Sequence, residues 1–117
     1  MPIPELVRRA AEKRIRDYCE RRIPARIRNE MRLEVVIEGN AITIVERRPP
    51  WRPKDDAEDW TSQGIARFRY EPRLGVWSLF WADRHGRWHR YGDTEPSLNV
   101  GPLLAEVDRD PMAIFWG

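Results

Sequence analysis

The chain has 117 residues, of which 41% are hydrophobic and 34% are charged, and its formal net charge is +2. This length and the mixed charges predict one globular domain over residues 1–117 rather than a disordered chain, and so small a net charge does not by itself indicate nucleic-acid binding. A single cysteine excludes an internal disulfide. No apolar stretch is long enough for a signal core or a membrane span. We therefore expect a cytoplasmic protein without membrane contact.

Residues 4–22 carry the pattern of an amphipathic helix. Val7, Ala11 and Ile15 recur at helical spacing and form an apolar stripe, while arginine and lysine residues occupy much of the remaining surface. Pro24 ends the helix, because a proline pushes the residue before it out of the helical region.

Residues 31–48 predict a β-hairpin. Gly39 and Asn40 form a two-residue loop between β-rich segments, which is the commonest hairpin connection. With this loop Glu38 pairs with Ala41, so aliphatic side chains at alternate positions share the face that packs on the core. The opposite face of this hairpin is rich in charged residues and is predicted to be solvated.

An irregular connection follows over residues 48–64, where prolines and a cluster of acidic residues disfavour a regular strand. A connection of this length is either mobile or functional. One hypothesis therefore places the site of a small hydrolase or transferase beneath residues 49–63. The candidate residues for that site are Arg48, Trp51, Asp59 and Trp60.

Three aromatic-rich strands are predicted at residues 65–70, 76–82 and 87–91. Two similar loops of four residues, at 72–75 and 83–86, separate them. Each loop ends in a glycine, the residue that most easily adopts the left-handed backbone conformation needed there. These strands complete a five-stranded antiparallel meander.

The loop lengths decide which side chains share a face. They place Tyr70 opposite Trp77 and Trp81 opposite Trp88, so these four residues are predicted to face the core. The opposite face is then predicted to carry six candidate binding residues: Arg67, Arg69, Phe80, Arg87, His89 and Tyr91. Arginines among aromatic rings can stack bases and neutralise phosphates. The same pattern also suits an ordinary solvated face, in which arginine stems shield the rings, or a dimer face.

A short helix is predicted over residues 100–108, capped by Asn99 or Ser97 and ended by Asp110. The fold class is therefore predicted to be α+β. An N-terminal helix and a short C-terminal helix should cover one face of the five-stranded sheet.

No residue pattern indicates catalysis. Two histidines and one cysteine are too few for a zinc site, and the acids at 55–59 lack the spacing of a calcium loop. Cys19 lies on the apolar side of the first helix, and no nucleophile-elbow, phosphate-loop or dinucleotide pattern occurs. We therefore expect no catalytic residue, metal or cofactor.

The predicted function is a non-catalytic binding or interaction module that uses the basic and aromatic sheet face. Its partner would be an anionic ligand, a nucleic acid or a protein, including a second copy in a homodimer. The small enzyme beneath residues 49–63 is the alternative.

Four segments resemble a family of small, uncharacterised bacterial proteins, a domain of unknown function. They are Glu46 to Trp51, Trp77 to Trp81, Trp88 to Tyr91, and Asp110 to Gly117. The resemblance covers essentially the whole chain and rests on the clustered tryptophans. It implies a bacterial intracellular protein with one compact domain, and it implies no activity, substrate or catalytic residue.

Overall fold

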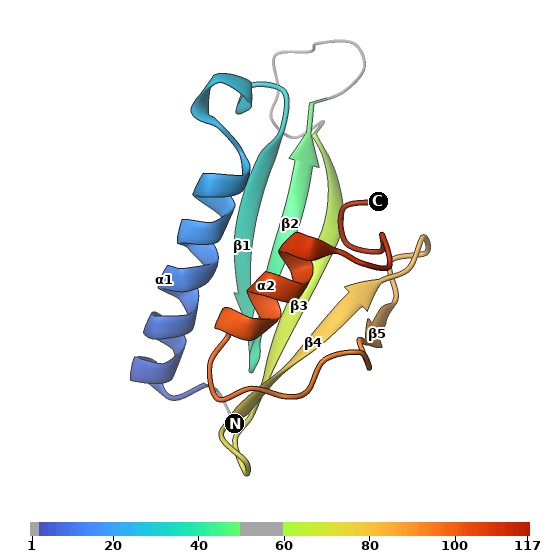
Figure 1. Ribbon diagram of the computed structural model, residues 1–117. Helices are drawn as coiled ribbons and strands as arrows, with labels where there is room; N and C mark the ends of the chain where they lie inside the picture. The colour runs from blue at the N-terminus through green and yellow to red at the C-terminus, as the bar shows by residue number, and fades with distance from the viewer. Residues whose placement is uncertain (1–2, 50–59) are drawn as a thin grey trace.

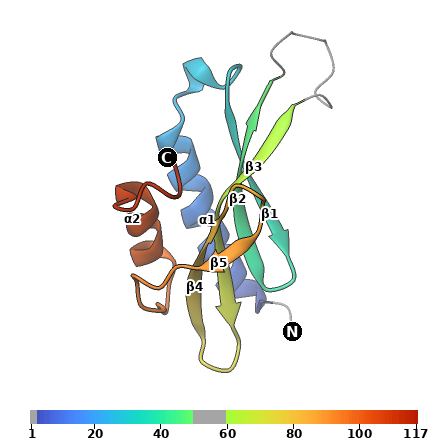
Figure 2. The same ribbon diagram turned by 90° about the vertical axis from the view of Figure 1, so that its right-hand side faces the viewer.

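A five-stranded antiparallel sheet carries two helices on one of its faces in the computed structural model, which describes residues 3–49 and 60–117 (Figures 1 and 2). The elements in chain order are α1 (Glu5–Arg22), the 3-10 helix η1 (Ala25–Ile27), β1 (Arg32–Glu38), β2 (Ala41–Arg48), β3 (Thr61–Glu71), β4 (Val76–Ala82), β5 (Trp88–Arg90) and α2 (Gly101–Arg109). The strands follow one another in the order β1-β2-β3-β4-β5. The predicted α+β class and its meander are confirmed. Within the described part of the chain, no helix combines the length and apolarity needed to cross a membrane.

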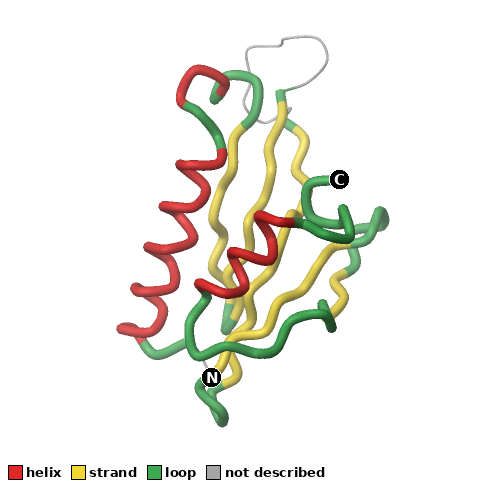
Figure 3. The backbone as a smooth tube through the Cα atoms, viewed as in Figure 1, coloured by secondary structure: helices red, strands yellow, loops and turns green. Residues whose placement is uncertain are grey.

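The core lies between the helices and the sheet face that they cover (Figure 3). Ile15 of α1 and Leu103 of α2 are fully buried there, together with Phe68 and Trp77 of the sheet. Cys19 is buried in the same layer, and burial raises the pKa of its thiol to about 11. A thiol held in its protonated form is a poor nucleophile, so Cys19 acts as a small core residue.

The first two hairpins have the predicted register. Glu38 pairs with Ala41 across the loop in which Gly39 has φ 57°, and Tyr70 pairs with Trp77 across the turn that ends at Gly75. The geometry of both turns depends on the backbone conformations of a few adjacent residues. Their lengths could therefore be predicted from the sequence.

A β-bulge between β2 and β3 was not predicted. Ile44 pairs with Ala66 and Val45 pairs with Gly64, so Ile65 is an extra residue on β3. Ile65 and Ala66 are therefore both buried, although neighbouring strand residues normally point to opposite faces. The bulge also turns Gly64 to the face of the sheet that the helices leave open.

The turn between β4 and β5 is one residue longer than predicted. Ala82 pairs with Trp88, so the loop comprises residues 83–87. The Asp83 carboxylate accepts hydrogen bonds from the backbone N–H groups of His85 (2.8 Å) and Arg87 (3.0 Å). An aspartate at the first loop position commonly closes a turn in this way, and here it holds the extra residue inside the loop.

This extra residue reverses the predicted alternation in β5. The predicted pairing of Trp81 with Trp88 is wrong, because Trp81 pairs with His89. His89 lies against the Trp81 ring, with the ring centroids 4.8 Å apart, and Arg87 stays in the turn. Tyr91 is buried rather than exposed, and its hydroxyl donates a 2.8 Å hydrogen bond to Glu106.

The C-terminal segment folds back onto the body through Asp110. Its carboxylate accepts hydrogen bonds from the backbone N–H groups of Ile114, Phe115 and Trp116 at 2.9, 3.1 and 2.9 Å. Asp110 itself has the left-handed backbone conformation (φ 44°) that ends α2. This cap keeps the Phe115 ring in the core.

Candidate functional site

The structure brings three of the six predicted binding residues together on the sheet face that the helices leave open, hereafter the outer face. Arg67 and Arg69 lie on β3, and Phe80 lies beside them on β4, where it pairs with Arg67. Arg87, His89 and Tyr91 are not part of it. Because the turn is one residue longer than predicted, two other residues of β5 lie on the outer face instead, Trp88 and Arg90. Neither was predicted to lie there. The Asp83 side chain in the turn was the signal that could have identified both.

The Trp88 indole is stacked beneath an arginine at the centre of the outer face. The Arg67 guanidinium carbon lies 4.4 Å from the centroid of the Trp88 ring, and Arg67 Nε donates a 3.0 Å hydrogen bond to Thr43 Oγ1. The indole lies directly over Gly64, where an added Cβ would come within 2.5 Å of a ring atom. The bulge that turns Gly64 outward thus creates the space in which Trp88 lies flat.

Arg69 and Arg32 also stack on aromatic rings. The Arg69 guanidinium lies 5.0 Å from the Phe80 ring centroid, and the Arg32 guanidinium lies 4.5 Å from that of Trp60. Arg69 is two residues from Arg67, so the two stacks that they form are neighbours along β3. Such contacts shield the rings from water and leave the positive charge of the guanidinium in place.

The positive charge of the arginines on the β3–β5 part of the outer face is only partly compensated, since the charge of Glu38 acts on Arg67 in the opposite sense to that of Arg69. Within residues 3–49 and 60–117, Arg67, Arg69 and Arg90 form no ion pair with a carboxylate. Burial, and then the charge of Arg69, lower the pKa of Arg67, although an arginine remains protonated at neutral pH. An anion bound here would relieve the repulsion between Arg67 and Arg69.

Acidic residues border the outer face on the β1 side. A shallow hollow of about 440 Å³ is lined by Glu34 and Glu38 on one side and by Arg67 and Trp88 on the other. Arg47 also lines it and pairs with Glu34 at 3.4 Å, which leaves Glu38 as the acid of this margin without an ion pair among the described residues. A second hollow of about 500 Å³ contains Arg69, Phe80 and Arg90. The outer face is therefore a basic and aromatic surface over β3–β5 with an acidic margin on β1.

The alternative site beneath residues 49–63 is only partly covered by the described residues. Trp51 and Asp59 lie outside them, as do the other acids at 55–59. Arg48 pairs with Glu46 at 2.5 Å, and Trp60 is stacked with Arg32. Over the described part of the chain, no three metal-ligating side chains gather in one place.

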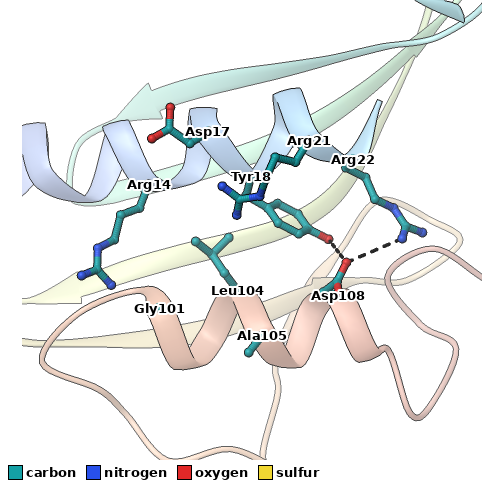
Figure 4. Close-up of a pocket in the computed structure, with 9 residues that line it drawn as sticks. All are labelled: Arg14, Asp17, Tyr18, Arg21, Arg22, Gly101, Leu104, Ala105 and Asp108. Atoms are coloured by element: carbon teal, nitrogen blue, oxygen red, sulfur yellow. Dashed lines mark hydrogen bonds and ion pairs between the residues drawn. The ribbon is translucent and has the colours of Figure 1, made fainter. Parts of the chain in front are cut away.

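A groove between α1 and α2 is the second notable feature of the surface (Figure 4). It encloses about 630 Å³ and is lined on the α1 side by Arg14, Tyr18 and Arg21. The Tyr18 hydroxyl donates a 3.2 Å hydrogen bond to Asp108 of α2. Burial, and then the charge of Asp108, raise the pKa of Tyr18 to about 12, so this phenol stays protonated and serves as a donor.

Comparisons with known proteins identify a family and no activity. A protein-family model described as "Domain of unknown function (DUF3024)" matches residues 3–117. No match was found among curated proteins or among solved structures.

Proposed function

We propose that this chain, which belongs to that family of unknown function, is a non-catalytic binding module whose outer face takes single-stranded nucleic acid. The observation that supports the proposal is the Arg67–Trp88 stack over Gly64 on the outer face. It holds together a flat ring and a guanidinium that has no carboxylate partner among residues 3–49 and 60–117. Single-stranded nucleic acid offers unpaired bases for stacking and phosphates for the guanidinium groups.

The spacing of the two central stacks favours a ligand that presents flat groups in succession. Arg67 and Arg69 are two residues apart on β3, which corresponds to about 7 Å along the strand. Each guanidinium covers a ring on one side, and we propose that a base stacks on its other side. A single small anion would use only one of these positions, whereas consecutive nucleotides would use both.

The acidic margin indicates where the strand would lie. Glu38 would repel phosphates from β1, whereas Glu34 is paired with Arg47. The ligand would therefore follow β3, β4 and β5, where Arg90 adds a further positive charge. Glu38→Gln is therefore expected to raise the affinity for a single strand, which is the opposite of the effect expected from the arginine variants.

The test is a fluorescence anisotropy titration of the purified protein with a short labelled single-stranded oligonucleotide of mixed sequence. We expect binding that weakens from about 50 mM to about 200 mM salt, because phosphate contacts release counterions. Arg69→Gln should lower the affinity about tenfold. It should also reduce the slope of log affinity against log salt concentration by about one, since one phosphate contact is lost. Absence of binding at low salt would reject the proposal.

A matched control separates this surface from general positive charge. Arg9 also lies on a basic surface, but it pairs with Glu5 at 2.8 Å on the opposite side of the molecule, in α1. Arg9→Gln changes the net charge as much as Arg69→Gln does, and it should leave the affinity unchanged. A duplex of the same sequence should bind more weakly, because its bases are already stacked. Equal losses in the two variants would mean that net charge alone attracts the oligonucleotide.

A further inference from the structure

We infer that the groove between α1 and α2 is a second binding site, built for an elongated organic dianion. The inference does not depend on the outer face. It depends on two arginines of α1, Arg14 and Arg21, which line the groove and form no ion pair with a carboxylate in the described part of the chain.

The carboxylates of the groove are already engaged. Asp17 forms a 2.9 Å ion pair with Lys13, and Figure 4 shows the Asp17 side chain directed away from α2. Asp108 accepts the hydrogen bond from Tyr18 and lies 3.6 Å from Arg22 Nη1. Neither carboxylate is left to neutralise Arg14 and Arg21, so among the described residues the groove retains a local excess of positive charge.

Arg14 is positioned by neutral groups. Its Nη1 donates a 3.0 Å hydrogen bond to Asn99 Oδ1, and the same oxygen accepts a 2.9 Å hydrogen bond from the backbone N–H of Gly101. Gly101 leaves room for the guanidinium, because an added Cβ would lie 2.7 Å from Arg14 Nη1. An amide orients the arginine without cancelling its charge, whereas an aspartate at position 99 would cancel it.

The spacing of the two arginines defines the ligand. Arg14 and Arg21 are seven residues apart, which puts them on one face of α1 and separates them by about 10 Å along the helix. Figure 4 shows Arg14 beside Gly101 and Arg21 leaning over Tyr18, with the Leu104 side chain of α2 between the two arginines. A matching ligand has an acidic group at each end and an apolar middle, as a long-chain dicarboxylate does.

Isothermal titration calorimetry with three simple carboxylates tests this geometry. Octanedioate has two charges and sufficient length, octanoate has similar length but one charge, and butanedioate has two charges but is short. We expect octanedioate to bind at least about tenfold more tightly than either of the others, since only it reaches both arginines. Equal affinities for all three, or no heat with octanedioate, would overturn the inference.

Substitutions test whether octanedioate binds in the groove. Arg14→Gln and Arg21→Gln should each weaken octanedioate binding about tenfold, while Arg26→Gln, an exposed arginine of η1 outside the groove, should not. Gly101→Ala retains every charge but displaces the Arg14 guanidinium, so it should weaken octanedioate binding and leave the melting temperature close to that of the unmodified protein. Loss in Arg26→Gln equal to that in Arg14→Gln, or unchanged binding in Gly101→Ala, would contradict the proposed site.

Discussion

The two faces of the sheet are built from alternating residues of the same strands, yet they are stabilised by different forces. On the covered face, Phe68 and Trp77 are at most 1% exposed, and the hydrophobic effect holds them. On the outer face, Phe80 and Trp88 are only partly buried and lie under arginine side chains. The comparison indicates that arginine can shield an aromatic ring from water while its own charge stays available to a ligand.

Replacing a phenylalanine by alanine on each face of the sheet should give the largest difference in stability between the two faces. Phe68→Ala removes a fully buried ring and should lower the free energy of unfolding by about 3–5 kcal/mol, through lost transfer energy and a cavity. Phe80→Ala removes a partly exposed ring and should cost about 1 kcal/mol, mainly the contact with Arg69. Urea unfolding measures both values. Equal losses would show that the outer face is packed as tightly as the core.

The flat position of Trp88 can be tested through the glycine beneath it. Gly64→Ala should destabilise the fold by about 1–3 kcal/mol, because the new Cβ would overlap the indole. Gly92→Ala is the matched control, since a Cβ at Gly92 meets nothing within 4 Å. Thermal unfolding should show a clear loss only for Gly64→Ala, and Trp88→Leu in the Gly64→Ala background should recover part of it. A loss that Trp88→Leu does not relieve would indicate another cause.

Acid should weaken the C-terminal cap on the helix-bearing side of the molecule, because the Asp110 carboxylate that forms this cap becomes protonated. Burial would raise the pKa of Asp110, but the N–H groups of Trp116, Phe115 and Ile114 outweigh it and lower the pKa. A carboxyl group with a lower pKa in the folded state stabilises the protein at neutral pH, and this contribution disappears as the pH falls below about 4 and through the folded-state value.

Asp110→Asn should therefore cost about 1–2 kcal/mol at neutral pH, where the charged hydrogen bonds exist. Urea unfolding at a series of pH values should show the difference between the variant and the unmodified protein shrinking in acid. A difference that is constant with pH would mean that the charge of Asp110 contributes nothing.

The smallest expected effect on stability is that of Arg69→Gln, which removes a surface charge that has no carboxylate partner in the described part of the chain. The free energy of unfolding should change by no more than about 0.5 kcal/mol, whereas the same variant loses oligonucleotide affinity. Urea unfolding and anisotropy on the same preparation compare the two quantities. A large loss of stability would assign Arg69 a structural role and weaken the proposed function.

Local turn chemistry made the first part of the sheet predictable. The Gly39–Asn40 loop and the turn ending at Gly75 each set a register through backbone conformations that a few adjacent residues dictate, and both registers are observed. The candidate site could be predicted only where it depended on those registers. Arg67, Arg69 and Phe80 were placed on the outer face, whereas Trp88 and Arg90 were missed because a side chain, Asp83, closes the next turn.

By itself, the sequence determined the two helices, the meander and the side of the sheet on which residues 66–70 of β3 and the residues of β4 lie, because the hydrophobic period and the turn type depend on neighbouring residues. Only the tertiary structure decided that Ile65 bulges inward, that Trp88 lies over Gly64, and that Arg14 meets Asn99, which is 85 positions away in the chain. These contacts depend on packing between distant segments, and no short window of sequence contains both partners.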